Sequence, residues 1–449
     1  MKITSIEVYD VRFPTSKTLA GSDAVHKNPD YSCAYIIINT DSEDKELKGH
    51  GLTFSLGRGN EVICKAIEAF SEVLVGKDFE NDILKDMMNK EDHKGFYYQI
   101  TQDGQLRWLG PEKGVIHMAA GAILNAIWDL WARKEKKPLW ELVVDMEPEE
   151  LVEFIDFKHM TDYIDKKEAL ELLKKVRPGW QERKELMKTQ GFRAYTTSCG
   201  WLGYSIEKVK KLCDETLKQG HTYFKMKVGS ANVQEDIDRA EAIRSVIGYD
   251  NGNFLMMDAN QKWDVTEAIE KMKLLSKFKP LWIEEPTNCD DILGHLTVAN
   301  ALKEFSDIGV ATGEVANSKI VFKQLIQTNA IKYCQIDSCR IAGISEILSV
   351  LLMAAKAKIK VCPHAGGVGL CEYVRHLVMI DYVCFNPIDE IDRVCESTAV
   401  LHEYFYDPVD FNKNDSGLFY KAPIRFGYAE MKKESIEKFQ FPNGEEWKK

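Results

Sequence analysis

None of the eleven cysteines in this 449-residue chain lies in a CxxC spacing, and their number is odd. Most of them lie in apolar strings, as in Tyr333-Cys334 and Val361-Cys362. Zinc sites and disulfide frameworks need regular cysteine spacing, so both are disfavoured. We predict buried, reduced thiols in an intracellular protein.

Positive charge is in deficit, with 59 Lys and Arg against 70 Asp and Glu and a net charge of −11. Without a basic excess to neutralise phosphates, nucleic acid and membrane surfaces are disfavoured as partners. The most apolar stretch that we identify, residues 347–355, is too short to span a bilayer. The N-terminus alternates like a strand, so we expect no signal or transit peptide there.

The first 150 residues predict an α+β domain. Strand patterns cover residues 3–13 and 33–38, a polar loop lies between them at 16–30, and residues 60–142 are largely helical. Because the strands precede the helices rather than alternate with them, the segment indicates a separate domain.

After about residue 190, short apolar strands alternate with amphipathic helices up to about residue 396. Repeated β-then-α units build a parallel sheet, which is either open or closed into a barrel. Neither a GxGxxG nor a Walker A motif accompanies these strands, so nucleotide-binding open sheets are disfavoured. A barrel would bring the carboxyl ends of its strands to one mouth.

Ionisable residues recur at the ends of these strands. From Lys227 onward the steps run from 23 residues (Glu314 to Asp337) to 32 residues (His364 to Glu396), and each fits one strand, one helix and two loops. A single charged residue at a strand end is usually a solvated loop edge, but an unbroken series favours one shared pocket. The series is Lys225, Lys227, Asp258, Glu284, Glu314, Asp337, His364 and Glu396.

Asp258, Glu284 and Glu314 are three hard oxygen ligands, which would repel one another at one mouth unless a cation held them. Mg²⁺ suits such a set, with water or substrate oxygens completing its octahedron. The lack of His or Cys among the three argues against zinc. The sequence therefore predicts a Mg²⁺ site.

Lys225 and Lys227 lie one residue apart on a strand, so both side chains point to the same face, which in a barrel is the pocket. Two ammonium groups held close lower each other's pKa, as a lysine base near neutral pH requires. Lysines that guard a solvated edge strand are the alternative. The carboxylates that follow favour the pocket.

Asp337 and His364 end adjacent units. An aspartate beside a histidine fixes its tautomer and raises its pKa, which makes a general acid or base. A histidine in an apolar string is more often a core residue, but Pro363 and the following Ala365-Gly366-Gly367 mark a strand-to-loop transition. A lysine base, this dyad and a divalent cation together suit proton abstraction next to a carboxylate.

With these residues identified, the chain resembles the enolase superfamily, and within it the mandelate racemase branch. The resemblance rests on Lys225-Met226-Lys227, Asp258-Ala259-Asn260, Trp282-Ile283-Glu284-Glu285-Pro286, Gly313-Glu314, Ile336-Asp337 and Pro363-His364. Within the branch the chain is most similar to the L-fuconate dehydratases, for example over residues 103–108, 201–205 and 362–372. The likeness covers nearly the whole chain.

The resemblance implies an α/β fold with an N-terminal α+β capping domain (residues 1–150) over a modified TIM barrel of (β/α)7β type (residues 151–405). A C-terminal segment, residues 406–449, would return to the capping domain. The resemblance also implies the dehydration of L-fuconate to 2-dehydro-3-deoxy-L-fuconate, with Mg²⁺ as the cofactor.

The same resemblance implies roles for single residues. Lys227 would take the proton from C2 of the acid sugar, and His364, oriented by Asp337, would be the general acid for loss of the 3-hydroxyl. The implied substrate-binding residues are Lys225, Gly21, Ser22, Asp23, Tyr31, Asn260 and Glu396. The polar loop 16–30 would close over the substrate, and Glu390 is the alternative to Glu396 as the last strand-end carboxylate.

A racemase or epimerase on the same scaffold stays open, as does a catalytically silent binding protein, because fold alone does not determine function. We expect a small acid sugar as the ligand and at least a homodimer. The resemblance implies a mitochondrial location, and the lack of a clear transit peptide leaves a cytoplasmic one open.

Overall fold

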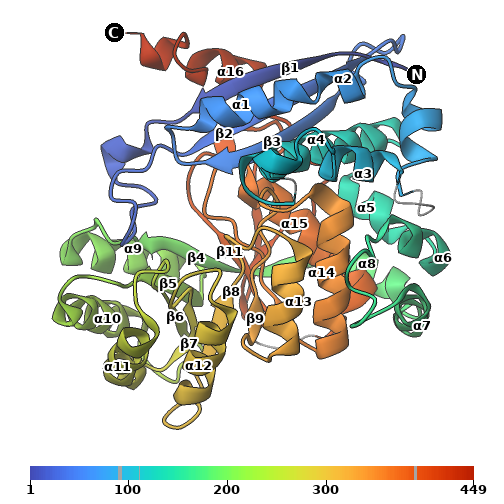
Figure 1. Ribbon diagram of the computed structural model, residues 1–449. Coiled ribbons are helices and arrows are strands. Elements are labelled where there is room, and N and C mark those ends of the chain that lie inside the picture. The colour runs from blue at the N-terminus through green and yellow to red at the C-terminus, as the bar shows by residue number, and fades with distance from the viewer. Residues whose placement is uncertain (89–93, 111, 389–391, 449) are drawn as a thin grey trace.

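A capping domain lies over a barrel in the computed structural model, which describes residues 1–88, 94–110, 112–388 and 392–448 (Figure 1). The cap contains an antiparallel sheet in the order β1 (Ile3–Arg12), β2 (Ser32–Thr40), β3 (Gly49–Ser55). The sequence patterns predict the first two strands but not β3, whose two glycines weaken the strand signal. Both are required by packing, because a Cβ at Gly51 would lie 2.2 Å from the carbonyl oxygen of Ala122.

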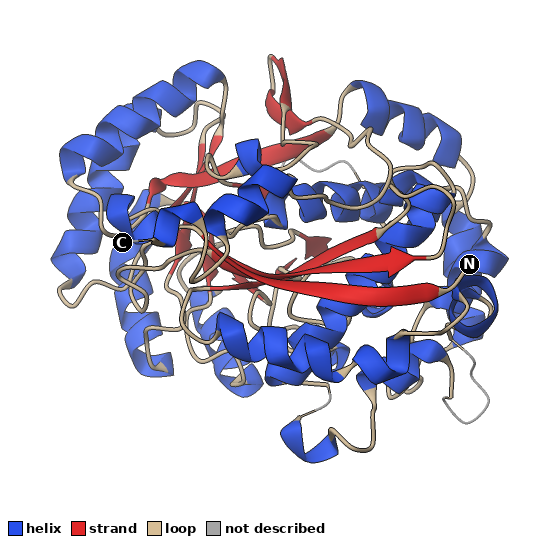
Figure 2. Cartoon of the chain, turned by 90° about the horizontal axis from the view of Figure 1, so that it is seen from above, coloured by secondary structure: helices blue, strands red, loops and turns tan. Residues whose placement is uncertain are grey.

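The helix that crowds β3 is α4 (Gly114–Lys134), which packs against β3 and β2. Seen from above, the long strands of the cap sheet lie side by side (Figure 2). By length and composition α4 could cross a membrane, and it is longer than the apolar stretch 347–355 identified from sequence. However, 89% of its most apolar window is buried inside the protein, as expected of a core helix. The other helices before the barrel are α1 (Asn60–Ala69), α2 (Ser71–Leu74), α3 (Phe96–Thr101), α5 (Leu139–Val144), α6 (Pro148–Leu151), α7 (Lys166–Val176) and α8 (Trp180–Thr189).

The barrel strands pair in parallel, in chain order from β4 to β10, and β11 returns to pair with β4. They are β4 (Phe192–Gly200), β5 (Tyr223–Lys227), β6 (Phe254–Asp258), β7 (Pro280–Glu284), β8 (Gly309–Thr312), β9 (Tyr333–Cys334), β10 (Lys360–Val361) and β11 (Cys395–Ser397). Between them lie α9 (Ile206–Gln219), α10 (Val233–Ile247), α11 (Val265–Leu275), α12 (Ile292–Leu302), α13 (Lys319–Gln327), α14 (Gly343–Ala357) and α15 (Leu370–Ile380). This alternation confirms the predicted (β/α)7β barrel.

An apolar layer fills part of the barrel interior, with members contributed by every strand or its flank. These residues are Tyr195, Tyr223, Met256, Trp282, Ala311, Tyr333, Cys362 and Val394. On several strands the residue of this layer comes two positions before an ionisable residue and so points to the same face, as Met256 does before Asp258. The ionisable side chains therefore lie at the carboxyl ends of the strands. All eleven cysteines are unpaired and all but Cys289 are buried, as the sequence predicts.

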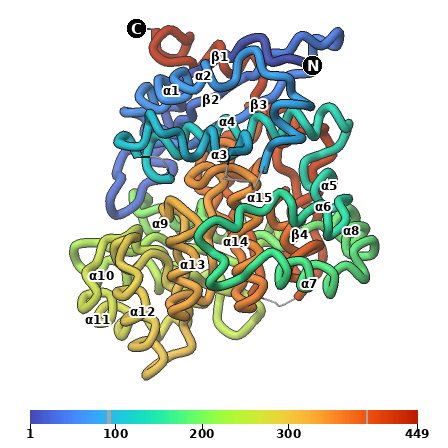
Figure 3. The backbone as a smooth tube through the Cα atoms, turned by 45° about the vertical axis from the view of Figure 1, so that its right-hand side comes forward, coloured from blue at the N-terminus to red at the C-terminus, as the bar shows by residue number. Residues whose placement is uncertain are grey.

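The C-terminal segment divides its contacts between barrel and cap. Its hairpin, β12 (Phe411–Asn414) and β13 (Gly417–Tyr420), pairs antiparallel with the start of β4 and so extends the barrel sheet. The chain then reaches the cap, where α16 (Lys433–Phe439) lies beside β1 and Val11 forms a bridge with Gln440 (Figures 1 and 3). The expected return to the cap therefore describes only the part of residues 406–449 that follows the hairpin.

Candidate active site

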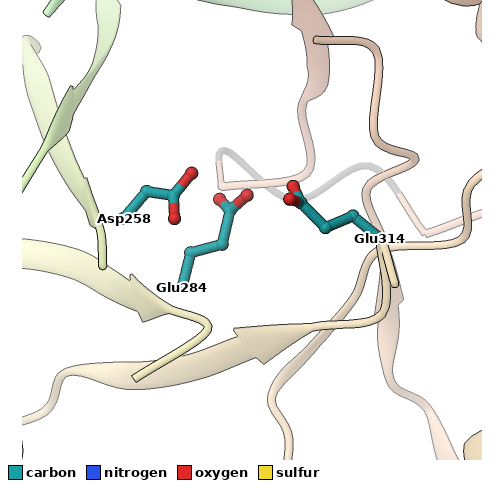
Figure 4. A group of neighbouring side chains, drawn as sticks. All are labelled: Asp258, Glu284 and Glu314. Carbon is teal, nitrogen blue, oxygen red and sulfur yellow. The ribbon is translucent and has the colours of Figure 1, made fainter. Parts of the chain in front are cut away.

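Strand register brings three carboxylates together at the barrel mouth. Asp258 is in register with Lys227 on one side and with Glu284 on the other, and Glu314 follows β8. One oxygen from each carboxylate lies within 4.8 Å of the other two, and the three groups point toward one another (Figure 4). Burial, together with the charge of Asp258, raises the pKa of Glu284 to about 8.

This carboxylate set fits a hard divalent cation. It offers oxygen ligands only, and Oε2 of Glu314 is buried and makes no hydrogen bond among the described residues, the nearest ring nitrogen being Nε2 of His364 at 3.5 Å. A buried acceptor without a donor is costly unless a cation or water satisfies it. The geometry therefore supports the predicted ligands Asp258, Glu284 and Glu314 and the predicted metal, Mg²⁺.

Lys225 lies beneath this set and is fully buried. Its Nζ is 2.8 Å from each oxygen of Glu284 and 2.9 Å from Oε1 of Glu396. Burial lowers the pKa of Lys225, but these two carboxylates and Asp258 outweigh burial and raise it well above its usual range. Lys225 does not line the cavity above. Its ammonium group is engaged by the protein's own carboxylates, and the expected contact with a substrate carboxylate stays a prediction.

Lys227 reaches the cavity and pairs with Asp258, with Nζ 2.5 Å from Oδ2. Burial and the charge of Lys225 lower the pKa of Lys227, whereas the carboxylates of Asp258, Glu314 and Asp23 raise it. The carboxylates have the larger effect, so the pKa of Lys227 is raised overall. Lys225 therefore does lower the pKa of Lys227, as predicted, but the expected net lowering is not found, because the nearby carboxylates outweigh the second ammonium group.

His364 and Asp337 form the expected dyad, with Nδ1 of His364 2.7 Å from Oδ2 of Asp337. Nε2 of His364 lies 3.5 Å from Oε2 of Glu314. Burial lowers the pKa of His364, yet Glu314, Asp337 and Glu396 raise it to about 9. Its imidazole is therefore protonated at neutral pH and available as an acid.

Glu396 lies on β11 and is almost fully buried. It accepts a hydrogen bond from the backbone N–H of Ala365 at 2.7 Å and pairs with Lys225. Burial raises the pKa of Glu396, but Lys225 and His364 lower it overall, so the group is ionised. The alternative residue, Glu390, lies outside the described residues.

One cavity of about 620 Å³ lies between the barrel and the cap, and it is lined by Lys227, Glu314, Asp337, His364 and Glu396 but not by Lys225, Asp258 or Glu284. The barrel contributes Thr197, Trp201, Lys227, Asn260, Glu314, Asp337, Arg340, His364 and Glu396, among others. The cap contributes Gly21, Asp23, Val25, His26, Tyr31, Phe54, Leu56, Ile63, Val115 and Met118, among others. The proton-transfer groups come from the barrel, whereas most of the apolar side chains that line the cavity come from the cap.

Known proteins share both the sequence and this architecture. The mandelate racemase / muconate lactonizing enzyme N-terminal domain matches residues 24–143, and the enolase C-terminal domain-like family matches residues 208–416. Human mitochondrial enolase superfamily member 1 is 53% identical over all of this chain and 98% of its own length. The chain belongs to the enolase superfamily.

Further relatives place the chain within the superfamily. The crystal structure of the same human protein superposes with a TM-score of 0.94 over 99% of this chain and 98% of that one. L-galactonate dehydratase of Hypocrea jecorina is 47% identical over 98% of this chain and 94% of its own length. L-talarate/galactarate dehydratase of Salmonella typhimurium LT2, described as liganded with Mg and L-lyxarohydroxamate, shares the fold at a TM-score of 0.71 and 24% identity, over 97% of this chain and 92% of that one.

Four substrate-binding residues are expected in the cap of this enolase-superfamily chain. Three of them line the cavity: Gly21, Asp23 and Tyr31. A side chain at position 21 is excluded, because Gly21 has a φ of +79° and a Cβ there would lie 2.3 Å from the hydroxyl oxygen of Tyr31. Ser22 does not line the cavity. Its hydroxyl instead donates to the carbonyl oxygen of Leu19 and accepts from the N–H of Gly203, and a contact of Ser22 with the substrate stays a prediction.

Asn260 lines the cavity with its amide nitrogen 3.5 Å from Oε1 of Glu314. Sequence reasoning missed two other cavity residues, His26 and Arg340. The signal for His26 is its place three residues after Asp23 in the polar loop, a spacing that allows a local side-chain pair. Nothing in the local sequence distinguishes Arg340 from a solvated arginine.

Proposed function

We propose that this protein is a Mg²⁺-dependent acid-sugar dehydratase, a hydro-lyase that converts L-fuconate to 2-dehydro-3-deoxy-L-fuconate and water. The observation that carries the proposal is that Lys227 and His364 line the same cavity as Glu314 of the carboxylate set. A base and an acid at one cavity can remove a proton and expel a hydroxyl from neighbouring carbons. The relatedness to an L-galactonate dehydratase supports the same reaction class.

Lys227 is the base for the C2 proton. It can take that proton only as the neutral amine, so its function depends on how strongly Asp258 holds its ammonium form at 2.5 Å. When bound, Mg²⁺ would be held by Asp258, Glu284 and Glu314 and would supply positive charge that offsets the ene-diolate. The pairing makes Asp258 both a metal ligand and the group that sets the proton affinity of the base.

His364 is the acid for the departing 3-hydroxyl. The pKa of about 9 favours the protonated imidazole at neutral pH, and Asp337 holds Nδ1. Nε2, which lies 3.2 Å from the backbone nitrogen of Gly366, is the nitrogen left to give its proton to the leaving hydroxyl. Loss of water gives an enol, which rearranges to the 2-keto acid. Lys225 supports the site from below by neutralising part of the charge of Glu284 and Glu396.

L-fuconate carries a terminal methyl group where L-galactonate carries a hydroxymethyl group. The cap lines its side of the cavity with Leu56, Ile63, Val115 and Met118. Burying a methyl group against apolar side chains is favourable, whereas a hydroxyl group at the same place finds no hydrogen-bond partner among them. This wall supports L-fuconate over L-galactonate as the preferred substrate.

A racemase or epimerase is the second candidate, because Lys227 and His364 could remove and return a proton from different sides. A silent binding protein is disfavoured, because every predicted barrel position that we assign to chemistry carries a competent side chain. We also propose an intracellular location, mitochondrial by analogy with the names of the relatives, and at least a homodimer.

Purified protein with Mg²⁺ should be incubated with L-fuconate, L-galactonate and a panel of other acid sugars, and a semicarbazide-reactive 2-keto product should be sought. We expect product from L-fuconate with a higher kcat/KM than from L-galactonate. A C2 epimer detected by NMR without keto product would establish the racemase. Binding of the sugars without either product would establish the silent homologue.

A further inference from the structure

The cap loop carries a second His–Asp pair at the cavity. Nδ1 of His26 lies 3.3 Å from Oδ2 of Asp23, and both residues line the cavity that contains Lys227 and His364. They come from the cap, whereas His364 and Asp337 come from the barrel. The mechanism above uses only the barrel pair.

The carboxylate of Asp23 is directed to its own loop. Its Oδ1 accepts hydrogen bonds from the backbone N–H of Val25 at 2.7 Å and of His26 at 2.6 Å. The N–H of Asp23 in turn donates to the carbonyl oxygen of His26 at 3.0 Å. These bonds close residues 23–26 into a tight loop, so Asp23 fixes the position of the His26 ring.

The ring of His26 is left with one nitrogen for a ligand. Its side chain is 49% exposed, and Nε2 has no hydrogen-bond partner among the described residues. With Nδ1 directed at Asp23, Nε2 can accept a hydrogen bond when neutral and donate one when protonated. A sugar hydroxyl can serve as either partner.

Ser22 connects this loop to the barrel through two hydrogen bonds. Its carbonyl oxygen accepts the N–H of Leu202, and its hydroxyl accepts the N–H of Gly203, each at 3.0 Å. Both partners lie in the connection between β4 and α9. The residue that precedes Asp23 is therefore fixed to the barrel, which limits the movement of His26 relative to Lys227.

We propose that His26, positioned by Asp23, hydrogen-bonds a hydroxyl group of the acid sugar on the carbons beyond the C2–C3 bond. The reacting carbons must lie at Lys227 and His364, on the barrel side of the cavity, so a group that enters from the cap meets the remainder of the chain. Asp23 is then a positioning residue rather than the direct substrate contact that the sequence predicts. This inference rests on the proposed function, because it requires an acid sugar in the cavity.

The test compares His26→Leu and His26→Gln on three substrates: L-fuconate, its analogue that lacks the C4 hydroxyl and its analogue that lacks the C5 hydroxyl. On the full substrate, His26→Leu should raise KM about tenfold or more with a smaller change in kcat, since a hydrogen bond to the substrate is lost. His26→Gln retains a polar group near the place of Nε2 and should recover most of the affinity. On one of the deoxy analogues, wild type and His26→Leu should have the same KM.

Asp23→Asn tests the positioning role. It should raise KM on the full substrate in the wild-type background but add nothing to His26→Leu, because the two changes remove one interaction. Lys27→Gln is the matched control, since Lys27 is on the same loop but lines a neighbouring cavity of about 670 Å³. It should leave both kinetic constants unchanged, and the melting temperatures of all variants report on folding.

Two results would overturn this inference alone. One is an active wild type in which His26→Leu leaves KM unchanged, and the other is a KM increase of the same size on the full substrate and on both deoxy analogues. A wild type that turns over no acid sugar would overturn the proposed function itself, and this inference with it.

Discussion

Nζ of Lys227 lies 2.5 Å from Oδ2 of Asp258 across adjacent strands β5 and β6. One carboxylate therefore serves both as a predicted Mg²⁺ ligand and as the ion-pair partner of the proposed base. The charge state of Lys227 and the occupancy of the metal site are coupled through Asp258.

The first prediction concerns this pair. Lys227→Ala should lower kcat by about 10³-fold or more, because the base is removed. Mg²⁺ affinity should be unchanged or higher, because the ammonium group no longer competes for Asp258. Activity assays and isothermal titration with Mg²⁺ measure the two effects. Lys277→Ala, at an exposed surface pair with Glu241, is the control. Retained turnover would refute the assignment of the base.

Removal of the metal is the second prediction. A chelator should abolish activity, and added Mg²⁺ should restore it and raise the melting temperature, since ligand binding stabilises the folded state. Glu314→Gln should weaken Mg²⁺ binding by about 10- to 100-fold, whereas Glu267→Gln on the exposed face of α11 should not. Full activity in the presence of excess chelator would contradict the metal assignment.

The third prediction separates the two proton transfers. His364→Ala should abolish formation of keto product but leave Lys227 able to exchange the C2 proton with solvent. In D₂O, NMR should therefore show deuterium entering the substrate without elimination. Asp337→Asn should retain part of the activity, since it disturbs the orientation of His364 but leaves the ring in place. If His364→Ala still eliminates water, another group is the acid.

A buried hydrogen-bonded pair between cap and barrel is the basis of the fourth prediction. Glu346 on α14 lies 2.8 Å from Nε2 of His117 on α4 and accepts the N–H groups of Lys319 and Ala342. Burial raises the pKa of Glu346, but His117 and Lys319 lower it from 4.5 to about 2. A carboxyl group whose pKa is lower in the folded than in the unfolded state stabilises the fold at pH values above its unfolded pKa. This contribution is lost as the pH falls through the folded pKa.

Glu346→Gln should therefore lower the free energy of unfolding by roughly 3 kcal/mol at neutral pH. The difference from wild type should shrink between about pH 4.5 and pH 2. Urea denaturation at a series of pH values measures it. Glu437→Gln on α16, whose side chain is exposed and pairs only weakly with Lys433, should show no such dependence. A Glu346→Gln difference that does not change with pH would contradict the shift.

Much of the site could be predicted because the carboxyl ends of the strands in a parallel barrel lie together at one mouth. Residues at successive strand ends are therefore close in space although they are far apart in the sequence. The residue types at successive strand ends were enough to predict that Asp258, Glu284 and Glu314 lie together as a candidate ligand set and that Asp337 and His364 form a pair. Strand β3 could not be predicted, because Gly49 and Gly51 serve contacts with α4 that are remote in sequence.

The roles of single side chains were less predictable than their positions. Ser22 follows Gly21 in the loop, yet its hydroxyl bonds to Gly203 instead of facing the cavity. Asp23 lines the cavity, yet its carboxylate is bound to its own loop. Hydrogen bonds of this kind depend on which backbone groups come within about 3 Å, and sequence spacing does not specify them.

The sequence by itself determined the alternation of strands and helices, the chemistry of the residues at the strand ends and, through them, the family and a hard-cation site. Only the tertiary structure decided the charge balance: Lys225 is held by Glu284 and Glu396, Lys227 by Asp258, and both lysines have a raised pKa. The physical reason is that periodicity is a local property of the chain. Electrostatic energy depends instead on distance and burial, which are set by the register of strands and the packing of the cap on the barrel.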